Sequence, residues 1–189
     1  NLLLTKEITN FCIKHNLELI FLSTHLPLKT SNKIKYNEYQ QAKIDSEELI
    51  KKNFCKKNIN YKILRLPNVY GNGCLYGIIP DLIKNMKKKE ITIKNSEKFR
   101  DFIFIDDLVK IIFKLIWIKK SFQLFLGTGK KIKIKTIVKK IKFIFGYNCK
   151  IIYSGNDNDI YKLNFGNKTL KKIIGSYKFI NIDKGLKKM

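Results

Sequence analysis

The stretch YKILRLPNVYG, Tyr61–Gly71, decides the fold of this chain. Its first part, Tyr61–Leu66, is a short and mostly apolar run, which is typical of a strand buried in a parallel sheet. A loop with three glycines, Pro67–Gly77, follows this strand. A similar apolar run lies upstream at Leu17–Leu22, so the sequence predicts a second buried strand there.

Helical and strand patterns alternate along the rest of the chain, with short connections and a polar, irregular segment at Ser23–Glu38. Apolar residues at helical spacing predict helices over Leu2–His15, Tyr39–Lys57, Pro80–Lys88, Asp106–Trp117, Ile134–Phe145, Thr169–Ile174 and Asp183–Lys188. The other strands that we expect are Ile91–Ile93, Phe122–Leu126 and Lys150–Tyr153. This alternation predicts an α/β fold with a parallel sheet.

The formal net charge of +24 reflects composition more than a nucleic-acid partner. Lysine occurs together with abundant Ile and Asn, as an A/T-rich coding sequence would produce, and it is spread along the whole chain. Arginine, which nucleic-acid binders normally use beside lysine, occurs only at Arg65 and Arg100. A planar guanidinium makes bidentate contacts that lysine cannot replace, so these two positions are candidates for specific roles.

Membrane and metal functions find little support in the sequence. No apolar run reaches the ~18 residues of a membrane span, because charged residues interrupt the longest one, Ile103–Ile118. Cys12, Cys55, Cys74 and Cys149 show neither metal-ligand spacing nor a CxxC motif. We therefore expect buried thiols in a reducing cytoplasm, with no metal site, no membrane partner and no signal peptide.

Tyr39 and Lys43 stand four residues apart, which places a phenol and an ammonium on one face of a helix. A lysine charge about 4 Å from a tyrosine hydroxyl favours the phenolate by about 4 kcal/mol at an effective dielectric of about 20. Such a phenol can exchange a proton with a sugar hydroxyl. The spacing alone is weak support, because nine tyrosines in a lysine-rich chain give about two chance matches.

The order of the motifs is more specific than any one of them. A strand ends at Thr24, the Tyr39–Lys43 pair follows, and then come LRLPNVYG (Leu64–Gly71), RDFI (Arg100–Ile103) and the Asp106-Asp107 pair. In this order the chain resembles the extended short-chain dehydrogenase/reductase family of NAD-dependent nucleotide-sugar epimerases and dehydratases. The resemblance covers nearly the whole chain and is most specific between about Phe21 and Gly129.

The resemblance implies three catalytic residues. Thr24 looks like the hydroxyl that binds the reacting sugar oxygen, Tyr39 like the general acid/base, and Lys43 like the group that binds the nicotinamide ribose and tunes the tyrosine. The plainer interpretations are a strand-end threonine that caps a turn and a solvated Tyr–Lys pair on a surface helix. Glu47, one turn further on, is expected to pack or to form an ion pair at the surface.

Three further positions resemble binding residues of the family. Pro67 resembles the residue beside the nicotinamide, Asn68 a contact to the substrate diphosphate or sugar, and Arg100 the arginine that clamps the nucleotide diphosphate. The alternatives are a turn role for Asn68 and an ion pair of Arg100 with Asp101 or Asp106. Helix capping explains Asp107, and the turn Gly127–Gly129 is expected to be structural, because it lacks the frame of a phosphate loop.

For the fold, the resemblance implies part of a Rossmann-like, doubly wound parallel sheet with a small C-terminal substrate-binding cap. The family sheet has the order 3-2-1-4-5-6-7, and this chain would supply strands 5-6-7. We expect residues 1–150 to form the later part of the NAD(P)-binding domain with interleaved substrate-binding segments, and residues 151–189 to complete the cap. Family members also suggest NAD or NADP as cofactor, a nucleotide-sugar substrate and a possible homodimer.

The chain departs from the family in three places. Leu26-Pro27-Leu28 replaces the usual Tyr-Gly, Phe104 replaces a frequent histidine, and no glycine-rich turn follows a first strand. We therefore expect this sequence to be a fragment that lacks roughly the first third of such an enzyme. The alternatives are a non-catalytic remnant or partner-binding protein of the same fold and, less favoured, a charge-driven binder of anions or nucleic acid.

We predict that residues 1–189 alone are poorly soluble or loosely folded and do not bind NAD tightly. The reason is that strand 5 and the helix faces beside it would lack their neighbours, and an open apolar edge promotes aggregation. Size-exclusion chromatography, thermal melting and NAD titration measure this. A monodisperse product that melts cooperatively and binds NAD at micromolar concentration would contradict the prediction.

Overall fold

A three-stranded parallel sheet forms the centre of the computed structural model, which describes residues 2–25, 36–155 and 166–189. Its strands are β1 (Leu19–Thr24), β2 (Tyr61–Leu66) and β7 (Phe122–Phe125), in the order β1-β2-β7. In the register, Thr24 lies opposite Leu66 and Leu64 lies opposite Leu124. This is the 5-6-7 arrangement that the sequence predicts.

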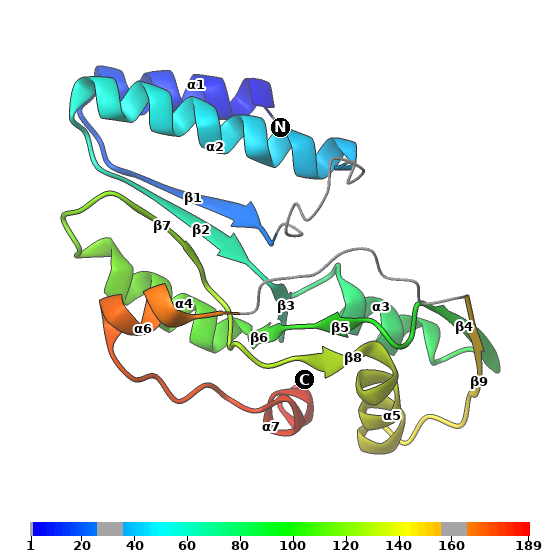
Figure 1. The fold of residues 1–189 in the computed structure, drawn as a ribbon. Coiled ribbons are helices and arrows are strands. Elements are labelled where there is room, and N and C mark those ends of the chain that lie inside the picture. The colour runs from blue at the N-terminus through cyan, green and yellow to red at the C-terminus, as the bar shows by residue number, and fades with distance from the viewer. Residues whose placement is uncertain (1, 26–35, 156–165) are drawn as a thin grey trace.

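Two long helices, α1 (Leu2–Lys14) and α2 (Glu38–Lys57), run side by side over one face of the sheet (Figure 1). Helix α2 begins at a capping box: the Asn37 side chain accepts the Gln40 amide N–H, and the Gln40 side chain accepts that of Asn37. Its buried side chains, Ile50 and Phe54, pack against β2 in an apolar core. The position of the N-terminal end of α2 is therefore fixed by local sequence.

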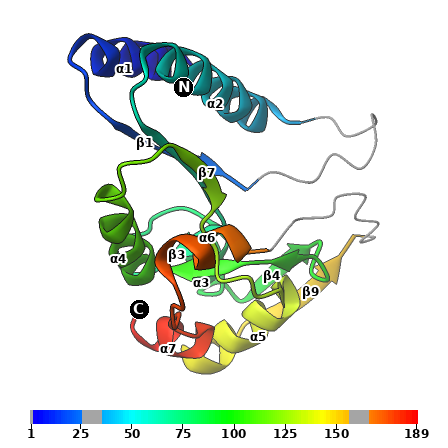
Figure 2. The same ribbon diagram turned by 60° about the vertical axis from the view of Figure 1, so that its left-hand side comes forward.

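Helices α4 (Ile105–Ile116) and α6 (Lys168–Ile174) cover the opposite face (Figure 2). Ile111 and Leu115 of α4 pack with Leu64, Leu124 and Leu170 in a second core. Helices thus lie on both faces of the parallel sheet, which is the Rossmann-like, doubly wound arrangement that the sequence predicts. Among the described helices, none is long and apolar enough to cross a membrane.

The remaining elements gather beyond the carboxyl ends of β1 and β2 (Figure 1). Three short strand pairs form here: β3 with β6, β4 with β9, and β5 with β8. The strands of the three pairs are β3 (Asn68–Tyr70) and β6 (Phe102–Phe104), β4 (Glu90–Lys94) and β9 (Lys150–Ser154), and β5 (Phe99–Arg100) and β8 (Ile132–Lys133). Helices α3 (Ile78–Asn85), α5 (Ile134–Ile144) and α7 (Ile182–Lys187) pack around them in a third core.

Short strands are the main difference from the sequence-based expectation. The predicted loop Pro67–Gly77 contains β3, which pairs in parallel with β6 just before α4. The boundary expected after residue 150, between the NAD(P)-binding part and the rest of the cap, falls just after the first residue of β9. Leu26-Pro27-Leu28 lies outside the described residues.

Capping is the wrong explanation for Asp107. The N-cap of α4 is Phe104, which makes no side-chain capping bond. The buried Asp107 carboxylate instead accepts the Tyr177 hydroxyl at 2.8 Å and the Ile180 amide N–H at 2.7 Å. Burial, and then the contact with Asp107, raises the pKa of Tyr177 to about 12. Asp107 thus ties the C-terminal segment to α4.

Replacement of Gly185 by alanine should destabilise the fold. An added Cβ would lie 2.8 Å from Cζ of the buried Tyr70, and closer still to its hydroxyl oxygen. We expect Gly185→Ala to lower the free energy of unfolding by about 1–3 kcal/mol, because overpacking forces neighbours apart. The loss, measured by urea denaturation, should be smaller in a Tyr70→Phe background. Equal losses in both backgrounds would mean that the crowding is elsewhere.

Candidate functional site

The carboxyl ends of the three parallel strands define the candidate site, because ligands of open α/β sheets bind beyond this edge. Thr24 is the last residue of β1 and is half-buried, and Pro67 directly follows β2. The His25 amide N–H donates to the Leu66 carbonyl at 2.9 Å, so the pairing of β1 with β2 extends past Thr24. Thr24 and Pro67 therefore lie at the same edge of the sheet.

Lys43 reaches this edge from α2. Its ammonium Nζ donates to the Leu22 carbonyl at 2.9 Å and lies 4.7 Å from the ring centroid of Phe21. Burial lowers the pKa of Lys43, and the negative charge of Glu47 opposes that change. The ammonium is therefore held two residues from Thr24.

Tyr39 lies one helical turn before Lys43, with its ring centroid 5.9 Å from the Lys43 Nζ atom. The tyrosine side chain is 52% exposed, so the phenol is open to a ligand arriving from solvent. Beside Thr24, the buried Ser23 hydroxyl has no hydrogen-bond partner within the described part of the chain. The structure thus brings Tyr39, Lys43 and the end of β1 together in one region.

A buried carboxylate fixes the helix that carries this pair. Glu47 is 2% exposed and accepts two bonds from the Arg65 guanidinium, at 2.9 Å and 2.6 Å, and a third from the Gln123 side-chain amide at 2.9 Å. The guanidinium of Arg65, a residue of β2, therefore binds a carboxylate of the protein itself. Glu47 forms the ion pair that the sequence suggests, but in the interior and not at the surface.

Asn68 has a structural contact in this fold. Its backbone and side-chain amide groups both donate to the Asp101 carbonyl, each at 3.1 Å. The buried Asp101 carboxylate accepts the Thr128 hydroxyl and the Gly129 amide N–H, the latter at 2.8 Å. Burial raises the pKa of Asp101, although these hydrogen bonds act in the opposite direction. The turn Gly127–Gly129 thus wraps around Asp101, in agreement with its expected structural role.

Arg100 lies on β5, opposite Ile132 of β8, and its side chain is half-buried. One guanidinium nitrogen donates to the Phe99 carbonyl at 2.8 Å. The two carboxylates considered as its partners have other contacts, since Asp101 binds the Gly127–Gly129 turn and Asp106 lies 3.9 Å from Lys188.

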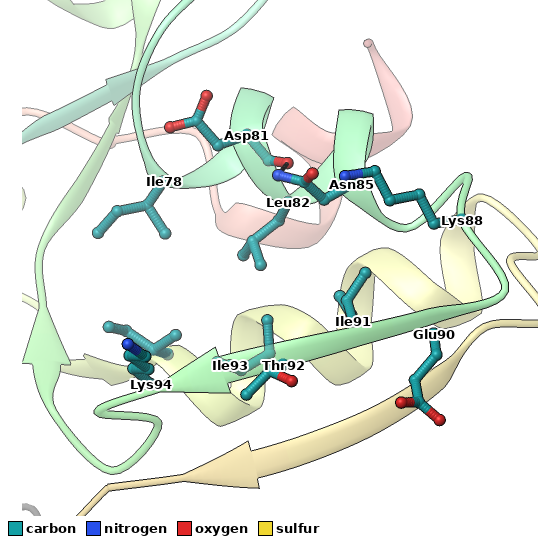
Figure 3. A pocket seen from close by; sticks show the side chains of 11 residues that line it. Ile78, Asp81, Leu82, Asn85, Lys88, Glu90, Ile91, Thr92, Ile93 and Lys94 are labelled. Atoms are coloured by element: carbon teal, nitrogen blue, oxygen red, sulfur yellow. Dashed lines mark hydrogen bonds between the residues drawn. The ribbon is translucent and has the colours of Figure 1, made fainter.

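A cavity of about 520 Å³ lies between α3 and β4, within the range of small-molecule sites. Figure 3 shows Ile78 and Leu82 pointing from α3 toward Ile91 and Ile93 of β4, which makes an apolar floor. Polar side chains surround this floor, namely Asp81, Asn85, Lys88, Glu90, Thr92 and Lys94. The cavity belongs to the group of elements beyond the carboxyl edge of the sheet.

The sequence reasoning did not identify Ser23, His25 or this cavity. His25 follows Thr24 directly, and its ring lies 4.2 Å from the ring of Phe125. Its position next to a candidate catalytic residue was a signal in the sequence. The cavity had a weaker signal, the alternation of buried Ile91 and Ile93 with exposed residues in β4.

The donors at this edge fit one end of a nicotinamide dinucleotide. The Lys43 ammonium is held at the Leu22 carbonyl, two residues before Thr24, where it can donate to a ribose hydroxyl. Within the described residues, no group of His, Cys, Asp and Glu side chains could hold a metal ion.

Comparisons with known proteins agree with this geometry. A family model described as "NAD dependent epimerase/dehydratase family" matches residues 1–121. CDP-abequose synthase from Salmonella muenchen is 36% identical over 136 residues, which are 67% of this chain and 45% of that protein. The chain thus spans less than half the length of this curated relative.

Two solved structures have the same fold. The UDP-glucose 4-epimerase of Thermotoga maritima superposes with a TM-score of 0.80 at 21% identity, over 96% of this chain and 65% of the epimerase. The UDP-N-acetylglucosamine 4-epimerase of Bacillus cereus superposes with a TM-score of 0.79 at 19% identity, over 99% of this chain and 68% of that epimerase.

Removal of the Glu47 carboxylate should loosen the helix that presents Tyr39 and Lys43. We expect Glu47→Ala to lower the free energy of unfolding by about 1–3 kcal/mol, because three donors lose their acceptor, although Arg65 can still reach water. Glu48→Ala, at the exposed neighbouring position, should change it by about 0.5 kcal/mol or less. Urea denaturation of both variants tests this, and equal effects would contradict the assigned role.

Proposed function

Because this chain belongs to the NAD-dependent epimerase/dehydratase family, we propose that it forms the substrate-binding and proton-transferring part of a nucleotide-sugar epimerase or dehydratase. The observation that carries the proposal is the position of Lys43, whose ammonium is bound to the Leu22 carbonyl one turn from Tyr39. Thr24 ends the same strand two residues later. The curated relative and the solved structures are longer than this chain, so the activity proposed is that of a whole protein.

In this proposal Tyr39 is the general acid/base. Its deprotonated phenol oxygen takes the proton of a sugar hydroxyl as that carbon is oxidised, and the resulting hydroxyl returns the proton when the carbonyl is reduced again. Thr24 donates a hydrogen bond to the same sugar oxygen and orients it toward the phenol. Lys43 lies one helical turn from this phenol, with its Nζ atom 5.9 Å from the ring centroid of Tyr39. Each role uses a side chain at the carboxyl edge of the sheet.

NAD, or NADP, supplies the hydride acceptor when bound. Lys43 would hold the ribose next to the nicotinamide, and Pro67 would lie beside the nicotinamide ring. Ser23, whose buried hydroxyl has no hydrogen-bond partner among the described residues, precedes Thr24 on the same strand.

Asn68 and Arg100 would bind the nucleotide sugar. Asn68 lies directly after Pro67, and Arg100 lies on β5, a few residues after β4. A guanidinium is suited to a diphosphate, because its planar fork binds two oxygens at once. We place the far end of the nucleotide sugar in the α3–β4 cavity, whose apolar floor and polar rim suit a base and its ribose.

A non-catalytic binding protein is the second candidate. It is favoured by the internal contact of Asn68, whose side-chain amide donates to the Asp101 carbonyl at 3.1 Å and is therefore used within the fold. The DNA ahead of codon 1 distinguishes the two candidates. An in-frame segment with a glycine-rich turn would support the enzyme, and a true start codon near Asn1 would support the binding protein.

Tyr39→Phe should abolish turnover and leave nucleotide binding intact. The test joins the N-terminal third of the Thermotoga maritima epimerase to this chain and follows conversion of UDP-glucose. We expect a loss of roughly 100-fold or more, because general acid–base groups contribute about 10²–10⁴-fold, with unchanged UDP affinity by calorimetry. Tyr76→Phe, at a position 85% exposed, is the matched control and should keep full activity. Unchanged turnover in Tyr39→Phe would reject the assignment.

A further inference from the structure

Helix α4 presents a second apolar face, which the proposed function does not use. Its buried face, including Ile111 and Leu115, packs on the sheet. On the outer face, Val109 is 55% exposed, Phe113 64% and Trp117 71%. With about 100° between successive helical residues, Phe113 lies roughly opposite the buried face. These side chains lie on the side of α4 that faces away from the sheet.

Lysines surround this outer face, which we define as Val109, Phe113, Ile116 and Trp117. A groove of about 550 Å³ runs along this face, and Lys110, Lys114 and Tyr177 line it together with Val109, Phe113 and Trp117. Lys119 and Lys120 follow at the end of the helix, and both are exposed. Lys110, Lys114 and Lys120 form no salt bridge within the described part of the chain.

The carboxylates at this helix do not offset the lysines. Asp107 is buried and accepts hydrogen bonds from Tyr177 and Ile180, and Asp106 pairs with Lys188 at the opposite end of the helix from Trp117. The outer face is therefore both apolar and positive. A binding partner must bury aromatic side chains and carry negative charge.

We propose that the outer face of α4 docks on an anionic lipid surface. Tryptophan prefers the boundary between headgroups and acyl chains, and lysines beside it keep their ammonium groups among the headgroups. Each lysine near an anionic bilayer contributes about 1 kcal/mol, and the net charge of +24 attracts the whole chain. A second copy of the chain is disfavoured, because two faces of the same positive charge repel each other.

An acidic protein is a weaker candidate than a bilayer. The groove that Phe113 and Trp117 line is open to solvent, and both residues are more than half exposed, so it is not an enclosed slot for a partner's side chain. Exposed aromatic residues with flanking lysines are the pattern of helices that lie in the membrane interface. The sequence analysis expected no membrane partner, because it found no spanning segment. Interfacial docking needs only one exposed face, and it is independent of the proposed enzymatic function.

Trp117 is the only tryptophan in the chain, so its fluorescence reports on this face directly. The experiment titrates the monodisperse fraction of the 189-residue chain with vesicles of phosphatidylglycerol and phosphatidylcholine, and with phosphatidylcholine alone. We expect a shift of the emission to shorter wavelength and co-sedimentation only with the anionic vesicles. Binding should weaken as salt rises from 0.1 M to 1 M, because the Debye length falls from about 10 Å to about 3 Å.

Phe113→Ser should weaken partitioning by roughly tenfold or more, because one buried phenylalanine contributes about 1.5–3 kcal/mol. Phe143→Ser on α5 is the matched control, since Phe143 is 87% exposed but lies away from α4, and it should bind as the parent does. Circular dichroism checks that both variants keep the fold. Absence of the shift, or equal losses in both variants, would overturn the proposal, as would binding only to an acidic protein.

Discussion

The Glu47 carboxylate is the constraint on which the candidate site depends. It accepts hydrogen bonds from Arg65 on β2 and Gln123 on β7, and so attaches one helix to two strands. A buried carboxylate without partners costs several kcal/mol, so other positions of α2 are strongly disfavoured. With α2 fixed, its first turns reach the end of β1, where Lys43 binds the Leu22 carbonyl.

The topology then places the remaining groups around this point. Parallel strands end at one edge, so Thr24 and Pro67 meet there without any special motif. The chain continues past this edge into the short strand pairs, and the Asp101 carboxylate, bound to Thr128 and Gly129, joins their base to the end of β7. The α3–β4 cavity forms in this outer group. The proposed reacting centre at the edge and the cavity beyond it would suit an elongated ligand with a sugar at one end.

The long elements of this fold and several short ones, such as α6 and α7, could be predicted from the sequence, but the shortest strands could not. Strand β2 occupies Tyr61–Leu66 as predicted, because a six-residue apolar run between polar segments has few other uses. Strands β3 and β6 have three residues each and form only because distant segments meet, so periodicity cannot reveal them. Tyr39, Lys43 and Thr24 were proposed from the order of motifs, and the fold brings them to one edge of the sheet. The partner of Arg65 could not be predicted from the sequence, because the packing of α2 brings Glu47 to it.

The central claim is that a sugar hydroxyl reacts at Tyr39, beside Thr24 and Lys43. The most direct measurement is a crystal structure of the intact protein with its dinucleotide and a nucleotide sugar. The account predicts a distance of about 2.6–3.2 Å from the Tyr39 hydroxyl oxygen to the reacting sugar oxygen, with Thr24 bound to that same oxygen. A sugar bound elsewhere, with the Tyr39 phenol turned toward solvent, would contradict it.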